Sequence, residues 1–295
     1  MSTQQLNGIL AMSAQNPFPI NAGPQAIRAW VEIAASHLPP ADNVSIERVN
    51  CGPCDGDLLQ PSGADRSRLI IFYHGGCFFF GSARTHRVLA SHLARAAGCA
   101  VLIPDYRLAP EHPGPAAHED ALGVYQWALR QGYAANRIAL SGDSAGGNLA
   151  VSTALRAKTA GLPLPAALAL MSPWVDFVGE GASHREVTDD PIISEELLDL
   201  GLKAYINGID LRSALVTPLY SDLTGLPPTL VHVGSWERLG DDSVTLVQRL
   251  SAAGVDAQLK IFAGMCHTWQ MYAPILEDGM ASLEECAAFI KAHQV

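Results

Sequence analysis

The order of segments along the chain predicts an α/β protein with a mostly parallel sheet and helices on both faces. From residue 68 onward, short apolar runs alternate with helical segments, as in strands joined by crossover helices. The run 69–73, Leu-Ile-Ile-Phe-Tyr, is apolar throughout, which is typical of a strand covered on both faces. With 295 residues, 48% hydrophobic and 16% charged, the chain is long and apolar enough to form a large core.

The charge balance and the termini argue against several classes of protein. Asp and Glu number 29 against 19 Lys and Arg, and the net charge of −10 repels nucleic-acid phosphates and anionic lipid. No apolar run reaches about 18 residues, the length of a membrane span. The N-terminus lacks the basic start of a secretory signal, and six cysteines are too few for a disulfide scaffold. We therefore expect a cytoplasmic protein with free thiols, no nucleic-acid partner and no membrane span.

Residues 1–40 are predicted to form an N-terminal cap segment. A helix is expected over residues 24–38, ended by Pro39-Pro40. A strand follows at 44–49. The next segment, Cys51-Gly-Pro-Cys54, spells a thioredoxin-type redox motif, but turn formers rather than a helix come after it. A hairpin turn is therefore the favoured interpretation, with no metal site expected.

The remaining strands are predicted from short apolar runs that end at turn formers. They are residues 69–73, 99–103, 138–140, 166–171, 229–233 and 257–262.

The helices between them are predicted from apolar residues at helical spacing and from end signals such as Gly98 and Gly254. They are residues 86–97, 116–130, 145–158, 241–253 and 275–293.

One stretch, residues 179–227, breaks this alternation. It contains no convincing strand, but Ser194 begins a capped helix that runs to Tyr205, with Glu195 and Glu196 in its first turn. We predict a helical cap insertion at 179–227, which lies with segment 1–40 over the carboxyl edge of the sheet. The core is then formed by 41–178 and 228–295.

The strongest motif is Gly142-Asp-Ser144-Ala-Gly146, which lies between a predicted strand and a predicted helix. This G-x-S-x-G pattern holds a nucleophilic serine on a strained turn, where small neighbours leave it room. The hydroxyl of Ser144 needs a base, and the base needs an acid that orients it.

Chain order selects the partners of Ser144. His267 follows strand 257–262, whereas His293 lies at the end of the last helix, so His267 is the predicted base. Glu237 follows strand 229–233 and is the predicted acid. Asp241 and Asp242 are explained as first-turn residues of the next helix, and Asp176 is a weaker alternative.

Backbone amides must also stabilise the oxyanion. His74-Gly-Gly-Cys77 follows strand 69–73 directly, and its glycines let the main chain approach a substrate. We expect the amides of Gly76, Cys77 and Ala145 to line the oxyanion hole, with Gly75 as a possible substitute. His74 is expected to fix the loop by hydrogen bonding.

These motifs together resemble the hormone-sensitive-lipase-like (bacterial family IV) esterases of the α/β-hydrolase superfamily. The resemblance covers residue 68 to the end, and it rests on four ordered segments: His74-Gly-Gly-Cys-Phe, Asp105-Tyr-Arg-Leu-Ala-Pro-Glu111, Gly142-Asp-Ser-Ala-Gly-Gly147 and Gly264-Met-Cys-His267. It implies the α/β-hydrolase fold and carboxylester hydrolysis through Ser144, His267 and Glu237. Cys77 stands where the family has a third glycine, and many members have Asp where Glu237 stands.

The expected function is therefore that of a serine carboxylesterase for small-molecule esters with short- to medium-length acyl groups, with no cofactor. Two alternatives stay open at this point. The same residues would serve a lactone, amide or carbamate hydrolase, and a non-catalytic binding protein could keep the hydrolase fold. The resemblance also allows a homodimer through the last strand and helix.

Overall fold

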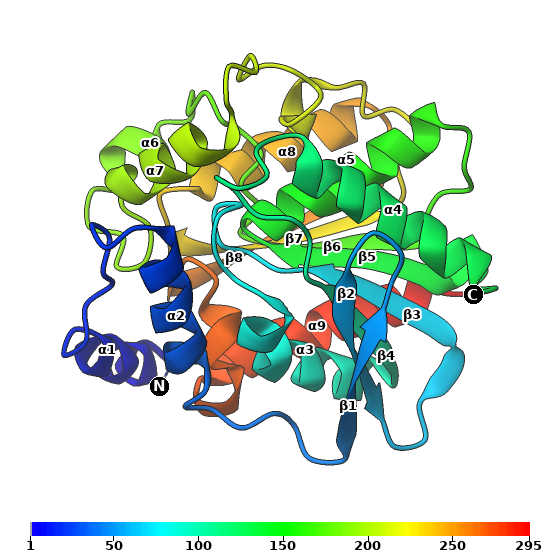
Figure 1. Cartoon of the computed structure of the whole chain (residues 1–295), viewed down its shortest axis with the longest axis horizontal. Coiled ribbons are helices and arrows are strands. Elements are labelled where there is room, and N and C mark those ends of the chain that lie inside the picture. The colour runs from blue at the N-terminus through cyan, green and yellow to red at the C-terminus, as the bar shows by residue number, and fades with distance from the viewer. Residues whose placement is uncertain (1) are drawn as a thin grey trace.

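The computed structural model describes residues 2–295 and is built around one eight-stranded sheet, in the order β1-β2-β4-β3-β5-β6-β7-β8 (Figure 1). Neighbouring strands from β4 to β8 pair in parallel, whereas β1 and β2 form an antiparallel hairpin that pairs with β4. The strands are β1 (Val44–Asn50), β2 (Asp55–Pro61), β3 (Asp65–Tyr73), β4 (Cys99–Pro104), β5 (Ile138–Asp143), β6 (Ala167–Met171), β7 (Thr229–Trp236) and β8 (Ala257–Cys266). The predicted α/β class is confirmed.

Nine α-helices are present in the described residues 2–295. They are α1 (Ser2–Ser13), α2 (Pro24–Ala35), α3 (Ala83–Ala97), α4 (Ala116–Arg130), α5 (Ala145–Thr159), α6 (Ser183–Glu186), α7 (Glu195–Tyr205), α8 (Gly240–Ala252) and α9 (Glu277–His293). None of those in the described chain is long and apolar enough to cross a bilayer.

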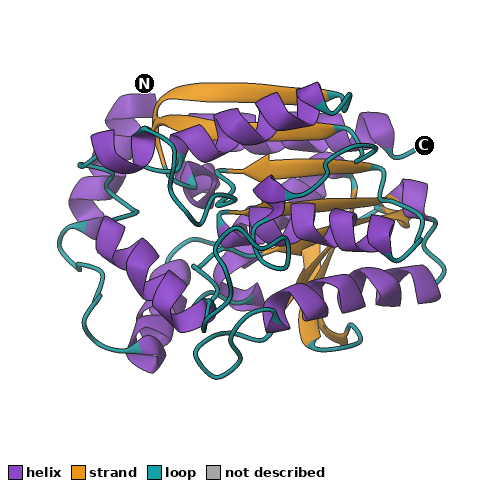
Figure 2. Cartoon of the chain, turned by 90° about the horizontal axis from the view of Figure 1, so that it is seen from above, coloured by secondary structure: helices purple, strands orange, loops and turns teal. Residues whose placement is uncertain are grey.

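The helices cover the sheet from both sides because the order in which strands are added to the sheet turns back after β4. It passes from β3 to β4, then back across β3 to β5, and right-handed connections place α3 and α4 on opposite faces. In Figure 1, α4, α5 and α8 lie above the sheet, and α3 and α9 lie below it. Seen from above, the strands at the two ends of the twisted sheet run in clearly different directions (Figure 2).

Two apolar layers follow from this arrangement. Alternate residues of β3 face opposite sides, so that Ile71 packs in the layer that includes α4 and α5, whereas Phe72 packs in the layer that includes α3 and α9. All of β3 from Leu69 to Tyr73 is buried, which explains why its sequence is continuously apolar.

The remaining helices, α1, α2, α6 and α7, gather at one end of the sheet (Figure 1). α1 was not predicted, since only Leu6 and Ile9 of its twelve residues are buried. These two pack against Phe262 and Met265 of β8. The division into cap and core segments stays a prediction.

The structure also extends three strands by three or more residues beyond their predicted ends. β5 runs to Asp143, β7 to Trp236 and β8 to Cys266, because their last residues pair with neighbouring strands although they are less uniformly apolar. Conversely, Trp269–Ile275 is a short 3₁₀ segment, and α9 begins only at Glu277.

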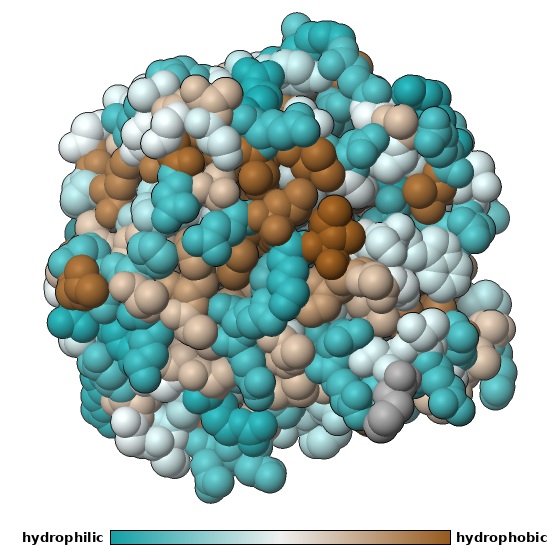
Figure 3. All heavy atoms as spheres, turned by 180° about the vertical axis from the view of Figure 1, so that it is seen from behind, coloured by the Kyte–Doolittle hydropathy of each residue, from teal (hydrophilic) through white to brown (hydrophobic). Residues whose placement is uncertain are grey.

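Some apolar surface remains exposed. Seen from behind, apolar residues gather near the middle of the face (Figure 3). Ile261 on the edge strand β8 is 54% exposed, which makes it a useful contrast to the buried isoleucines of β3.

We predict that Ile71→Ala lowers the free energy of unfolding by about 2–5 kcal/mol, because it removes buried methyl groups and leaves a cavity. Ile261→Ala, the matched control on an exposed strand position, changes it by less than about 0.5 kcal/mol. Urea denaturation followed by circular dichroism measures both. Equal losses for the two variants would contradict the assignment of Ile71 to the core.

Candidate active site

Ser144 lies in the turn between β5 and α5, in a backbone conformation that a serine rarely adopts. Its φ and ψ are 52° and −120°, and its amide donates to the Met171 carbonyl at 2.9 Å. The turn packs so tightly that a Cβ at position 146 would lie 1.8 Å from the Tyr73 carbonyl oxygen. Glycine is therefore required at this position because a side chain would clash. The strained turn that the G-x-S-x-G motif predicts is present.

Glu237 and His267 meet at the carboxyl ends of β7 and β8. Glu237 Oε2 lies 3.1 Å from Nδ1 of His267, and both side chains are almost completely buried. Glu237 Oε1 accepts hydrogen bonds from the Gly234 amide at 2.6 Å and from the Ser172 hydroxyl at 2.8 Å. These two donors hold the carboxylate so that its other oxygen faces the imidazole.

The surroundings of His267 act on its pKa in opposite directions. Burial lowers the pKa, but the hydrogen bond and charge of Glu237, with the charges of Asp190 and Asp143, raise it above the ordinary value of 6.5. The pair is linked to the serine turn through β6: Ser172, which donates to Glu237, directly follows Met171, whose carbonyl accepts from the Ser144 amide.

The second ring nitrogen of His267, Nε2, is buried without a hydrogen-bond partner in residues 2–295. Within the same residues, the hydroxyl of Ser144 makes no hydrogen bond to it. Catalytic hydrogen bonds are often long in free enzymes and tighten when substrate binds. The structure thus brings Glu237 and His267 into contact and leaves Nε2 free to accept a proton.

The loop His74-Gly-Gly-Cys77 follows β3 and has an unusual backbone. φ is positive at Gly76 (116°), and also at Cys77 (50°) and Phe78 (63°), which are not glycines. In the described chain, the amides of Gly76 and Cys77 have no hydrogen-bond partner, and Ala145 is the first residue of α5, where an amide has no partner in its own helix. These three donors are available for an oxyanion.

The amide of Gly75, the possible substitute donor, has a partner in this structure. It donates to Oδ1 of Asp143 at 2.9 Å. A Cβ at position 75 would lie 2.3 Å from Oδ2 of the same carboxylate. The hydrogen bond between the Gly75 amide and the Asp143 carboxylate therefore links the loop to the serine turn.

His74 fixes the loop, as its sequence position suggested. Its Nδ1 lies 2.8 Å from the Gly75 carbonyl, its ring stacks on Tyr106 at 4.2 Å between centroids, and the Tyr106 hydroxyl donates to its carbonyl at 2.7 Å. Burial, with a smaller effect of nearby His86, lowers the pKa of His74 to about 4, which keeps the ring neutral.

Sequence reasoning missed Arg28, which binds the backbone just after this loop. Arg28 on α2 donates to the carbonyls of Phe79 at 2.8 Å and Ala109 at 2.7 Å, and it pairs with Glu111 at 2.7 Å. Its partners lie more than fifty positions away, so no local pattern identifies it. Ser172 was missed for the same reason, whereas Asp143 lies inside the serine motif and could have been singled out.

The alternative acids have other partners. Asp176 accepts hydrogen bonds from the amides of Val178 and Glu180 and from the Tyr220 hydroxyl, and within residues 2–295 it forms no hydrogen bond or ion pair with His267. Asp242, in the first turn of α8, is buried and accepts from two backbone amides after β6, at positions 175 and 176. It fastens that loop to α8 in addition to its favourable place at a helix N-terminus.

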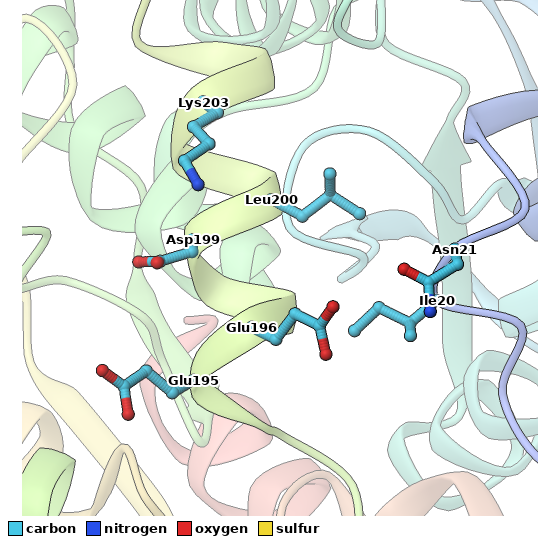
Figure 4. Close-up of a pocket in the computed structure, with 7 residues that line it drawn as sticks. All are labelled: Ile20, Asn21, Glu195, Glu196, Asp199, Leu200 and Lys203. Atoms are coloured by element: carbon cyan, nitrogen blue, oxygen red, sulfur yellow. The ribbon is translucent and has the colours of Figure 1, made fainter.

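A pocket of about 490 Å³ opens between the α1–α2 connection and α7 (Figure 4). Its lining residues are Ile20, Asn21, Glu195, Glu196, Asp199, Leu200 and Lys203. Leu200 points from α7 toward Ile20 across this space, and the next residue of α7, Gly201, faces Cys77 of the loop.

Comparisons with known proteins show the family of the chain. A family model described as alpha/beta hydrolase fold matches residues 70–271. The chain belongs to this alpha/beta hydrolase family. The match spans both the loop after β3 and His267 at the end of β8, and the predicted family resemblance is confirmed.

Similar curated and solved proteins are named as an acetyl-hydrolase or as esterases. An acetyl-hydrolase of Streptomyces hygroscopicus is 40% identical over 256 residues, 86% of this chain and 83% of that protein. An esterase of Acinetobacter venetianus is 36% identical and covers 95% and 93%. The crystal structure of an esterase from the bacterial hormone-sensitive lipase (HSL) family has a TM-score of 0.94 at 39% identity, covering 100% of this chain and 98% of that one. The expectation of a carboxylester hydrolase is confirmed.

We predict that Glu237→Gln lowers the pKa of His267, because burial then acts without the carboxylate charge that opposes it. Histidine Cε1–H resonances followed by NMR across a pH titration measure the shift. Asp222→Asn, which removes an exposed carboxylate that pairs with Lys158, is the matched control and leaves the titration of His267 in place. An unchanged pKa in Glu237→Gln would show that the Glu237 contact does not govern this imidazole.

Proposed function

We propose that the chain hydrolyses esters of short- to medium-length acyl groups through an acyl-enzyme formed on Ser144, with His267 as base and Glu237 as the acid that orients it. The observation that carries this proposal is the 3.1 Å contact between Glu237 Oε2 and His267 Nδ1. It fixes the protonated nitrogen at Nδ1, and Nε2 is then the acceptor.

The reaction proceeds in two halves. Nε2 of His267 accepts the proton of the Ser144 hydroxyl while the oxygen attacks the ester carbonyl, and the imidazolium then protonates the leaving alcohol. Water, activated by the same nitrogen, hydrolyses the acyl-enzyme and releases the carboxylic acid. Because the attacking step requires neutral His267, the rate falls as the pH decreases below its raised pKa.

The negative charge of the tetrahedral intermediate develops on the former carbonyl oxygen. The amides of Gly76, Cys77 and Ala145 donate to it, and the positive end of α5 adds to their effect. Loss of one such donor typically costs about 10²–10³ in kcat. No cofactor takes part in these steps.

In this proposal, segments 1–40 and 179–227 act as a cap that limits the length of the acyl group. Leu200 and Ile20 line the pocket between the two segments, together with charged residues of α7. A cytoplasmic location and a homodimer through β8 and α9 stay predictions from the sequence.

We predict that Ser144→Ala lowers kcat for short p-nitrophenyl esters by about 10⁶, because the nucleophile is lost. Ser45→Ala, on the exposed face of β1, is the matched control and keeps wild-type turnover. A series of esters from acetate to laurate, with a lactone, an amide and a carbamate beside it, defines the substrate class, and we expect the highest kcat/KM at short to medium acyl length. Wild-type turnover by Ser144→Ala would exclude the proposed nucleophile.

A further inference from the structure

Cys77 contacts helix α7 at a point where no additional atom fits. A Cβ on Gly201 would lie 2.8 Å from the Cβ of Cys77 and 3.1 Å from its carbonyl oxygen. Gly201 and Cys77 are both buried, and Trp174 is the next neighbour of the same space, at 3.6 Å. The helix therefore approaches the loop closely only because residue 201 has no side chain.

A second contact on the same face of α7 reinforces the first. Tyr205 lies one helical turn after Gly201, and its ring stacks on Phe78 with 4.2 Å between centroids and an interplanar angle of 10°. Two consecutive residues of the loop, Cys77 and Phe78, thus pack against two residues of α7 that are four positions apart.

The backbone of the loop is strained at Cys77 and Phe78, and side chains from other elements hold it in place. Cys77 and Phe78 have left-handed backbone angles, which non-glycine residues keep only where their surroundings require it. Arg28 of α2 donates to the carbonyl of Phe79, the next residue along the chain. Both α2 and α7 therefore contact this segment, and α7 also lines the pocket of Figure 4.

We propose that Gly201 is a positioning residue: through the Cys77 contact, helix α7 sets the position of the amides that stabilise the oxyanion. The inference rests on the proposed role of the Cys77 amide in ester hydrolysis. It assigns to α7 an effect on the chemical step, beyond that of covering the site.

Gly201→Ala tests this inference, because the added methyl group must displace either α7 or the loop by a few tenths of an ångström. We expect kcat to fall by about 10-fold with little change in KM, since a misplaced donor loses part of the 10²–10³ that one oxyanion donor contributes. The Ki of a trifluoromethyl ketone, which forms a tetrahedral adduct with the serine, rises in parallel. Gly8→Ala in α1, where a Cβ meets nothing within 4 Å, is the matched control and leaves kcat unchanged.

Two double variants distinguish a specific effect of the Cys77 contact from a general loss of structure. In each, Gly201→Ala is combined with a substitution of Cys77. Cys77→Gly removes the Cβ at 2.8 Å and leaves only the 3.1 Å contact with the carbonyl oxygen, so in this background the loss of kcat caused by Gly201→Ala is clearly smaller than in the wild type. Cys77→Ala retains that Cβ, and in this background the full effect of Gly201→Ala persists. An effect of equal size in both backgrounds, or a Gly201→Ala enzyme with wild-type kcat and Ki, would overturn the inference.

If Gly201→Ala alone does not fold at the assay temperature, Tm gives the same answer. Recovery of Tm with Cys77→Gly but not with Cys77→Ala supports the contact, and no recovery with either overturns it. The failure of the proposed function is distinguishable: a wild-type enzyme without Ser144-dependent turnover refutes both, whereas an active wild type with an insensitive Gly201→Ala refutes only this inference.

Discussion

The backbone of the serine turn lies against the carboxyl end of β3 so closely that residue 146 has no room for a side chain. This close approach determines the arrangement of the whole site. It places Ser144 beside the loop that begins at His74, and it lets the carboxylate of Asp143 reach the Gly75 amide. The proposed nucleophile and the proposed oxyanion donors are thus parts of one packed unit, and a side chain at position 75 or 146 would disrupt it.

The other parts of the site reach this unit from strands that end at the same edge of the sheet. Because β5 to β8 are parallel and adjacent, the residues after β7 and β8 arrive near the serine turn although they lie roughly a hundred positions later in the chain. Ser172, after β6, links the set by donating to Glu237. Its own amide donates to the carbonyl of His232 in β7, so the loop after β6 is also part of the support.

The sequence allowed the fold class, most strands and helices and the candidate residues Ser144, Glu237 and His267 to be predicted, because each depends on local pattern and on chain order. The engagement of Gly75 by Asp143 was not predictable, since it depends on the position of a side chain 68 residues away. Arg28 and Gly201 belong to the same class: their partners in the loop after β3 become neighbours only when α2 and α7 pack against it. Helix α1 was missed because only Leu6 and Ile9 of it are buried.

The most direct test of the central claim is the site at which an organophosphate reacts with the wild-type chain. Mass spectrometry of the digested adduct should find the phosphoryl group on the peptide that contains Ser144, because the proposed mechanism gives this hydroxyl an imidazole base and backbone donors for the developing negative charge. A phosphoryl group on another residue, or no adduct at all, would contradict the account.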